Sequence, residues 1–522
     1  MPDCDVAVIG AGPTGLALAL DLARRGVPVR IFDRVPEPFA GSRGKVVTVR
    51  TQEVLDDFGI VDRLREAGFS HLWHRVYLRG VMVRDYDPAA GGLPGPGRPF
   101  DYGPVFIPQW RLEHLLRDAL TEFGVHVEYG MELTDFGQSA DAVTLQLAGG
   151  ESIQTGWLVG CDGAHSTVRK RLGLSFVGPV DGGGMQGMLL GDVRVDGLAP
   201  DRWYQWSDPD RGFVALCPFR GSDTWQFQGG LFADLGPDGN WPAPGVDRFQ
   251  RTLDAVAGRT DIRLSQPTWL STWRVNVRMV ERLRVGRVLV AGDAAHVHPP
   301  AGGLGMNTGI QDAYNLGWKL GWVLNGADPQ LLDSYQAERL PIAQWTLGVS
   351  TESLHQLDSD LTDGKFDGIA ATASRDVHQL RLGYPWSPLA VDASGPVSTV
   401  TAGYRAPDAL CQYPDGAPVR IFDLFRGPHF TVLGFGPETA PAVASITGTD
   451  VRGVVVGAGG DRGVDLVDVD GAARRAYGVD GAALLLIRPD GYVGVTAAPA
   501  DAGAVSNYLA PLADTRRRGG EG

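Results

Sequence analysis

The chain has 522 residues, which is too many for one hydrophobic core, so we expect about three domains. Hydrophobic residues make up 43% and charged residues 21%, as in an ordinary folded protein, and no stretch has the composition of a disordered segment. The net charge of −14 and the lack of a basic patch in the sequence argue against a nucleic-acid-binding protein.

Cysteine and histidine spacing gives no sign of a disulfide framework or a metal site. Four cysteines are scattered without a CxxC pair: Cys4, Cys161, Cys217 and Cys411. Such cysteines are typically reduced and buried, so we expect a cytoplasmic protein. His296 and His298 have the spacing of a metal pair, but no carboxylate or cysteine stands at a matching distance, so we expect no metal. The first apolar run is broken by glycines and a proline, and we expect no membrane span.

The first 35 residues have the pattern of a dinucleotide-binding unit. Residues 5–10 are an apolar run, typical of a strand buried on both faces of a parallel sheet. Residues 10–15 read GAGPTG and match the GxGxxG spacing, and residues 16–25 then predict a helix. Residues 27–32 predict a second strand, so the glycines lie where a strand turns into a helix.

Each part of this unit suits a bound dinucleotide. Gly10 permits the tight turn, Gly12 lets the backbone approach a pyrophosphate, and Gly15 lets the helix pack against the strand. The helix N-terminus offers free N–H groups to the phosphates. Asp33 is placed to accept hydrogen bonds from ribose, which favours FAD or NAD over NADP, and the adjacent Arg34 joins the candidate cofactor contacts. The alternative, a glycine loop that binds nothing, is disfavoured by this combination.

A second glycine pattern at residues 454–459 does not repeat the unit. Its third glycine position is Arg462, and the residues that follow alternate as in a strand, so we expect a strand and a turn. A nicotinamide reductant, NADPH or NADH, must then bind without a Rossmann unit of its own.

Two aspartates follow predicted strands further along the chain. Residues 157–160 lead to Asp162, and residues 287–291 lead to Asp293, each beside small residues. A carboxylate there can reach a polyol such as the ribityl chain of a flavin. The alternative for either aspartate alone is a turn residue or a helix cap.

A glycine-rich segment follows Asp293 and has the character of a flat-ring site. Its glycines free the backbone to lie against a ring, and a helix beginning near residue 307 points its positive end at a bound anion. The candidate flavin contacts in this segment are Pro300, Gly303, Gly305, Met306 and Asn307.

In this order and spacing the motifs resemble the single-component FAD-dependent aromatic hydroxylases with the p-hydroxybenzoate hydroxylase fold. Residues 10–15 are similar to the family's pyrophosphate motif, residues 161–169 to its Asp-Gly motif, and residues 292–307 to its ribityl and flavin-ring segment. Residues around Arg43 resemble the flavin-contacting loop, and residues around Gln109 resemble the FAD-binding glutamine segment. The resemblance covers about residues 1–395.

The resemblance implies an α/β fold, in which a Rossmann-type FAD-binding domain carries an inserted antiparallel or mixed β-sheet substrate domain. We expect the FAD-binding domain at residues 1–180 and 276–395, with 70–105 contributing to the substrate side, and the substrate domain at 181–275. The closest similarity is to the branch that modifies polyketides and antibiotics, whose C-terminal thioredoxin-like domain corresponds to residues 396–522. That domain lacks CxxC here, so we expect a scaffold, a dimer surface or a lid.

The middle of the chain is unusually aromatic and alternates as strands do. Residues 225–228 put two aromatics on one strand face and two glutamines on the other. We expect one sheet face to stack on a flat polycyclic substrate, with Trp203, Phe213, Trp225 and Phe227 as substrate contacts. The alternative for each residue taken singly is an aromatic core.

The implied chemistry is hydroxylation of an aromatic, polyketide-type substrate. NAD(P)H would reduce FAD, and O2 would give a flavin C4a-hydroperoxide that transfers oxygen to the ring. Arg43 and Pro300 are the candidate catalytic residues: Pro300 stiffens the loop at the flavin ring, and Arg43 or Lys45 would activate a phenol, unless the substrate is acidic enough to need no protein base. The alternatives are Baeyer–Villiger oxygenation, an FAD dehydrogenase without oxygen insertion, and a non-catalytic flavoprotein. We expect a monomer or a homodimer.

Overall fold

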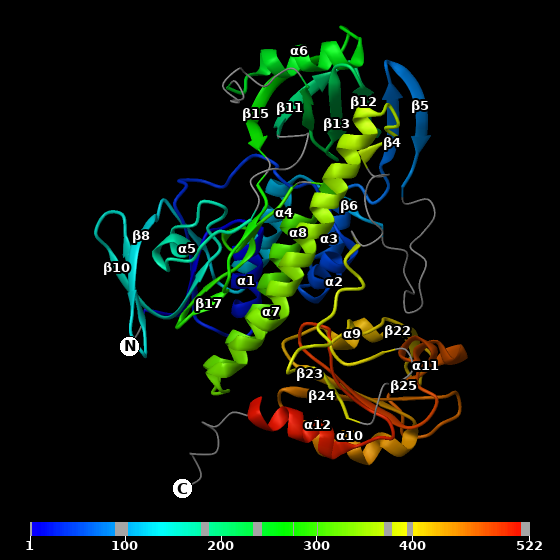
Figure 1. The fold of residues 1–522 in the computed structure, drawn as a ribbon. Coiled ribbons are helices and arrows are strands. Elements are labelled where there is room, and N and C mark those ends of the chain that lie inside the picture. Colours follow the sequence, from blue (N-terminus) through cyan, green and yellow to red (C-terminus); the bar gives the residue numbers. More distant parts are fainter. Residues whose placement is uncertain are drawn as a thin grey trace.

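The computed structural model describes residues 3–88, 103–178, 187–232, 243–274, 276–299, 301–369, 378–393 and 400–512. Pro300 lies outside these residues. The described chain contains three large sheets, each with its own helices, and the long helix α8 runs between the first two sheets (Figure 1). No described helix is both long and apolar enough to cross a membrane.

The first sheet has eight strands, and its centre is parallel. The order is β17-β18-β10-β1-β2-β7, with β9 beside β10 and β8 beside β9. Residues 6–8 in β1 are fully buried, so both faces of the sheet are covered here, and the apolar run in the sequence reflects this. The strands are β1 (Cys4–Ile9), β2 (Val29–Asp33), β7 (Val127–Tyr129), β8 (Leu133–Gln138), β9 (Val143–Leu147), β10 (Ser152–Gly160), β17 (Arg284–Val285) and β18 (Val288–Val290).

Helices around the first sheet connect it to the rest of the molecule. α1 packs on α7 and α4, and α8 continues past the sheet so that Leu354, Leu357 and Leu361 join a cluster with Met188 and Phe213 of the second sheet. The helices are α1 (Pro13–Ala23), α2 (Val49–Asp57), α3 (Val61–Ala67), α4 (Gln109–Thr121), α5 (Thr167–Arg171), α7 (Leu304–Leu324) and α8 (Asp333–Thr362). Short 3-10 helices lie beside them: η1 (Gly292–Ala294), η2 (Ala301–Gly303) and η3 (Pro329–Leu332).

The second sheet has seven strands in the order β15-β11-β14-β13-β12-β4-β5, antiparallel except where β12 pairs with β4. One face is covered by α6 (Val246–Ala257). We call the opposite face the inner face, because α8 and the loop at residues 39–45 pack on it. The strands are β4 (Trp73–Leu78), β5 (Val81–Tyr86), β11 (Gly187–Asp196), β12 (Arg202–Asp208), β13 (Gly212–Pro218), β14 (Thr224–Leu231) and β15 (Arg263–Arg274).

The third sheet is mixed, in the order β20-β27-β26-β23-β24-β25-β21-β22, with helices on both faces, as in a thioredoxin-like fold. Residues 454–459 form the end of β24 and a turn, which confirms the prediction of a strand and a turn there. The strands are β20 (Val391–Asp392), β21 (Leu410–Gln412), β22 (Pro418–Arg420), β23 (Phe430–Phe435), β24 (Val451–Gly457), β25 (Leu466–Val467), β26 (Ala483–Ile487) and β27 (Val493–Ala497). The helices are α9 (Ile421–Phe425), η6 (Pro437–Thr439), α10 (Ala440–Ile446), η7 (Val469–Gly471), α11 (Ala472–Tyr477), α12 (Ala502–Leu509) and η8 (Ala510–Leu512).

Two short strand pairs tie the loops between the sheets. β3 (Val46–Val47) pairs with β6 (Val105–Phe106), and β16 (Arg278–Met279) pairs with β19 (His296–Val297). The second pair holds the segment after Asp293 against the chain that leaves the second sheet. The division of the chain into domains near residues 180, 275 and 395 stays a prediction.

Candidate active site

The glycine turn between β1 and α1 is open where a phosphate would lie and closed elsewhere. A Cβ on Gly10, whose φ is +104°, would lie 2.4 Å from the Cys161 carbonyl oxygen, and a Cβ on Gly15 would lie 1.9 Å from the Gly10 oxygen. A Cβ on Gly12 would meet nothing within 4 Å. α1 begins after Gly12 without a side-chain cap, so its first N–H groups are left for an outside anion.

Asp33, at the end of β2, braces this turn. Its carboxylate accepts from the Ala11 N–H at 2.7 Å and from the Val35 N–H at 3.1 Å. A carboxylate has about four acceptor positions, so two remain for the hydroxyls of a ribose. The side chain is half-buried, and Arg34 beside it is exposed.

The Asp162 carboxylate is hydrogen-bonded to groups of the protein itself. Its carboxylate accepts from the Ser166 hydroxyl at 2.5 Å, from the Thr167 N–H at 2.6 Å and from the Val168 N–H at 3.2 Å, which are the groups at the start of α5. The geometry matches the helix-cap alternative for this residue. Burial raises the pKa of Asp162, and these three donors oppose the shift.

Asp293 differs from Asp162, because its side chain reaches the surface although protein atoms crowd around its carboxyl. Burial by the surrounding protein raises the pKa of its carboxyl, and the charges of His296 and Arg43 oppose the shift. The turn is held from behind by Asp312, which accepts from the Gly292 N–H at 3.1 Å and from His296 Nε2 at 2.6 Å. The carboxylate of Asp293 thus stays without a hydrogen-bond partner among the described residues, while its own backbone is fixed.

The loop that carries Arg43 lies close enough to Asp293 for the Arg43 charge to act on its carboxyl. Arg43 is exposed and packs 5.3 Å from the centre of the Phe39 ring. The next residue, Gly44, donates its N–H to Gln109 Oε1 at 3.0 Å, and Gln109 Nε2 donates to Glu113 Oε1 at 2.9 Å. Burial raises the pKa of Glu113 to about 7. Gln109 therefore fixes the loop from beneath.

The segment before α7 meets the same loop. Gly303 has a left-handed φ of +65°, and Met306 Sδ would lie 3.2 Å from a Cβ on Gly44. A Cβ on Gly305 would lie 3.0 Å from His298. Asn307 is fully buried and donates to the carbonyls of Val46 and Gly303 at 2.8 Å each.

Asn307 acts here as a clamp between the two segments, since its Oδ1 also accepts from the Thr48 N–H at 2.9 Å. The structure thus brings Arg43, Gln109, Asp293, Met306 and Asn307 to one region. Gly10, Gly12, Gly15 and Asp33 lie at the other end, where β1 and β2 end. Pro300, which was predicted both as a flavin contact and as a catalytic residue, lies outside the described residues.

The four predicted substrate aromatics lie on opposite faces of the second sheet. Trp225 and Phe227 point toward α6, where the Phe227 ring centre is 4.6 Å from that of Phe249. Trp203 and Phe213 lie on the inner face, toward α8 and the Arg43 loop. Trp225 and Phe227 are core residues in this fold, because the outer face must be covered by apolar packing, and we remove both from the candidate substrate contacts.

The inner face carries polar residues that the sequence interpretation had not assigned. The strand register places Asp192 of β11 beside Gln226 of β14, and Gln228 follows two residues later in β14. Lys45 reaches this row and donates to Gln226 Oε1 at 2.7 Å. The alternation that grouped the two glutamines was a usable signal, because buried amides on one strand face need partners there.

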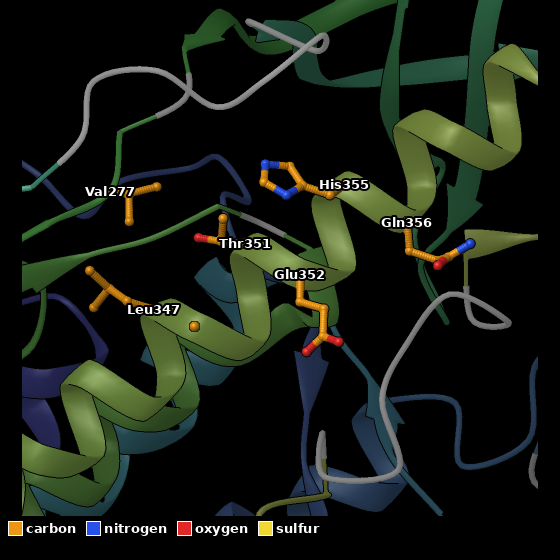
Figure 2. A pocket seen from close by; sticks show the side chains of 7 residues that line it. Val277, Leu347, Thr351, Glu352, His355 and Gln356 are labelled. Carbon is orange, nitrogen blue, oxygen red and sulfur yellow. The ribbon is translucent and has the colours of Figure 1, made fainter.

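A hollow of about 600 Å³ opens between α8 and the end of the second sheet. It is lined by Val277, Leu347, Gly348, Thr351, Glu352, His355 and Gln356, and Figure 2 shows most of these side chains along α8 with Val277 opposite. Val277 directly precedes β16, which pairs with β19, and η2 packs against α8. The chain at Val277 and the helix α8 thus link the hollow to the glycine-rich segment before α7, which itself does not line it.

The residues present fit an extended dinucleotide with a flavin ring. The open cradle at Gly12 and the uncapped α1 N-terminus suit a pyrophosphate, and Asp33 has free acceptor positions for ribose. The exposed carboxylate of Asp293 suits ribityl hydroxyls, because it has no hydrogen-bond partner among the described residues. No group of three potential ligands among the described His, Cys, Asp and Glu side chains is arranged to hold a metal ion.

Comparison with known proteins identifies the families to which the two parts of the chain belong. Residues 3–349 match the FAD binding domain family, and residues 399–514 match the family of the aromatic-ring hydroxylase C-terminal domain. The chain is 38% identical over 510 residues to a flavin-dependent monooxygenase of Mycobacteroides abscessus, covering 94% of this chain and 96% of the relative. It is 34% identical over 521 residues to a 6-methylpretetramide 4-monooxygenase of Streptomyces rimosus, covering 94% and 91%.

A solved structure shares the whole architecture. The ternary complex of aklavinone-11 hydroxylase with FAD and aklavinone superposes with a TM-score of 0.79 at 26% identity, covering 98% of this chain and 99% of that one. The similarity spans the first, second and third sheets, so the predicted α/β architecture is confirmed. The chain belongs to the FAD-dependent monooxygenases that combine an FAD-binding domain with an aromatic-ring hydroxylase C-terminal domain.

Proposed function

We propose that the protein hydroxylates a flat, polycyclic aromatic compound of polyketide type, using FAD, NAD(P)H and O2. The observation that carries the proposal is the hollow beside α8, whose volume of about 600 Å³ lies in the usual range for small-molecule sites. Its walls are apolar at Val277 and Leu347 and polar at Thr351 and His355, as suits a ring system with oxygen substituents. The names of two relatives, a 6-methylpretetramide 4-monooxygenase and an aklavinone-11 hydroxylase, support the same class.

The site residues have distinct proposed tasks. The Gly10–Gly15 turn and Asp33 would hold the pyrophosphate and ribose, and Asp293 with the segment from Gly303 to Asn307 would hold the ribityl chain and ring. When bound, FAD supplies hydride acceptance and the activation of O2. The chain's own part is to orient the aromatic ring and exclude water, for which the apolar cluster of Phe213, Met188 and the α8 leucines is suited. Arg43 stays a candidate for contact with both cofactor and substrate.

NADPH oxidation by the purified holoenzyme across a panel of aromatic polyketides tests the proposal. We expect strong stimulation by one group of compounds and a product heavier by one oxygen atom, labelled when 18O2 is supplied. A labelled lactone or ester would instead indicate Baeyer–Villiger oxygenation. Turnover without label would indicate a dehydrogenase, and failure to retain FAD would indicate a binding protein.

Several finer points are part of the proposal and have separate tests. The inserted sheet, at residues 181–275 with a contribution from 70–105, acts as the substrate domain, and residues 396–522 act as a scaffold or dimer surface. Light scattering distinguishes a monomer from a homodimer, and KM values distinguish NADPH from NADH. The four cysteines are buried and unpaired, which supports a cytoplasmic location.

A further inference from the structure

Lys45 is buried between the Arg43 loop and the inner face of the second sheet. Its Nζ donates to Gln226 Oε1 at 2.7 Å and to Gln228 Oε1, and it lies 4.3 Å from the centre of the Trp203 ring. Only 7% of the residue is exposed. The proposed function gives no task to this ammonium group, although its neighbour Gly44 packs beside Met306 in the candidate flavin segment.

The hydrogen bonds of Lys45 fix the direction of both amides. An ammonium group only donates, so each glutamine must turn its carbonyl oxygen toward Lys45. The Gln226 amide nitrogen then donates to the Ser42 carbonyl, so both ends of this fully buried amide are hydrogen-bonded. Gln228 is only half-buried, and its NH2 group is turned away from Lys45.

Gln228 also lies nearer to the hollow than Gln226. Its register partner on β13 is Ala215, and Phe213, the next residue on the same face of that strand, packs in one cluster with Val277. Val277 lines the hollow. The NH2 group of Gln228 is thus a polar donor on the inner face, on the side of Lys45 where the cluster of Phe213 and Val277 lies.

Unused polar atoms surround Lys45. Within the described residues, Nε2 of His74 and Nε1 of Trp203 are buried without a hydrogen bond. The buried carboxylate of Asp192 meets Ser42, but at a geometry poorer than that of a good hydrogen bond. Buried polar atoms without partners are rare and costly. Several of them around one ammonium group indicate that a polar ligand or ordered water completes the site.

The groups around Lys45 do not fully neutralise its positive charge, so an anion is favoured beside it. Burial lowers the pKa of Lys45 to about 8, so it is mainly protonated at pH 7. Burial raises the pKa of Asp192 to about 7, against the effects of Ser42 and Lys45, so this carboxyl is ionised only in part. The pKa of Cys217 is raised to about 12 and that of His74 is lowered to about 3, both by burial, so neither balances the ammonium charge.

We propose that Gln228 binds an ionised phenol oxygen of the aromatic substrate by donating an N–H, and that Lys45 is the positioning residue whose charge stabilises this phenolate. The inference rests on the proposed function, since it requires a phenolic substrate in the hollow. On binding, the phenol O–H bond breaks and its proton passes to the buffer, while the electron pair stays on the oxygen. The resulting phenolate is more electron-rich than the phenol, as transfer of oxygen to the ring requires.

Titration of a bound dye tests this without turnover. Alizarin, a dihydroxyanthraquinone that changes colour on ionisation, is added to the oxidised holoenzyme without NAD(P)H, and its absorbance is followed against pH. The ammonium charge would act on the phenolate through the Gln228 amide in a buried site, so Lys45→Met should raise the pKa of bound alizarin by about one unit. Lys45→Arg should restore most of the shift. Lys365→Met is the matched control, because Lys365 is exposed and pairs only with Asp363 among the described residues.

Gln228→Leu provides a second variant at a half-buried position. Losing a hydrogen bond to a charged oxygen should weaken alizarin binding about 10-fold, with FAD content unchanged. An equal alizarin pKa in wild type and Lys45→Met, or no alizarin binding to the wild-type holoenzyme, would overturn the inference. A normal titration combined with no oxygen insertion into any aromatic compound would instead overturn the proposed function alone.

Discussion

Gly12→Ala separates the folding of the glycine turn from its proposed task. The backbone at Gly12 has φ −76° and ψ −179°, which alanine adopts freely, and a Cβ there meets no protein atom within 4 Å. Alanine is a poorer helix cap than glycine, but it also lowers the entropy of the unfolded chain, and these effects partly cancel. We therefore expect the free energy of unfolding of the apoprotein to change by less than about 0.5 kcal/mol.

FAD binding should respond very differently to the same substitution. The added methyl group occupies the space where the pyrophosphate approaches the backbone, and the loss of one charge-assisted N–H bond costs about 1.5–3 kcal/mol. The dissociation constant of FAD should rise about 10- to 100-fold, measured by flavin fluorescence during reconstitution of the apoprotein. At 100-fold, saturating FAD would add about 2.7 kcal/mol less stability than in the wild type. Wild-type affinity in Gly12→Ala would refute the assignment of this turn to the pyrophosphate.

Three further predictions concern the sheet faces, the two aspartates and the buried lysine. Phe227→Ala should lower the free energy of unfolding in urea by about 3–5 kcal/mol without a direct effect on KM. Phe213→Leu should lower that free energy by under about 1.5 kcal/mol but raise KM. Equal effects of the two variants on KM would contradict the assignment of faces. Asp162→Asn should destabilise the apoprotein by about 1–2 kcal/mol. Asp293→Asn should leave the melting temperature of the apoprotein unchanged but weaken FAD binding. Thermal unfolding with and without FAD measures both effects. Burial lowers the pKa of Lys45 to about 8 from the ordinary 10.5, so between these pH values the unfolded chain binds more protons than the folded chain. The free energy of unfolding therefore rises with pH, by roughly 3 kcal/mol from this group. Urea unfolding at pH 8 and 10 should show that Lys45→Met lacks this rise.

Local patterns predicted the dinucleotide unit well, because its geometry depends on neighbours in the sequence. The strand, the glycine turn and the helix at residues 4–23 follow from apolar runs and from backbone positions that only glycine tolerates. Gly10 and Gly15 are required by contacts under 2.5 Å that any Cβ would make. The same kind of reasoning identified residues 454–459 as a strand and a turn.

The orientation of the second sheet was beyond sequence reasoning. Alternation predicted correctly that Trp225 and Phe227 share one face and Gln226 and Gln228 the other, but which face looks toward the cofactor depends on where α6 packs. The contact of Lys45 with Gln226 spans 181 residues, and no local pattern encodes it. The two glutamines were as informative as the aromatic residues, because amides away from water need hydrogen-bond partners whereas aromatic side chains pack anywhere in a core.

The third sheet is joined to the candidate site by a buried charge cluster. Arg488, at the end of β26, donates to both oxygens of Glu338 in α8 at 2.7 and 2.9 Å, and to Asp490. Lys319 in α7 donates to Glu338 at 2.7 Å. All four side chains are at most 1% exposed, and the two cations balance the two carboxylates. Breaking such a cluster by removing one member typically costs about 3–5 kcal/mol.

Adjacent residues of α8 connect this cluster to the site. Glu338 faces the third sheet, and the next residue, Arg339, donates to Asp312 Oδ1 at 2.7 Å. Asp312 in turn holds the turn that presents Asp293, through the Gly292 N–H. Since the rotation and register of α8 fix both contacts together, the C-terminal domain contributes to the position of Asp293 although it lies outside the FAD-binding region. Loss of that domain would leave Glu338 and Lys319 without Arg488 and Asp490, which supports the proposed role of a scaffold.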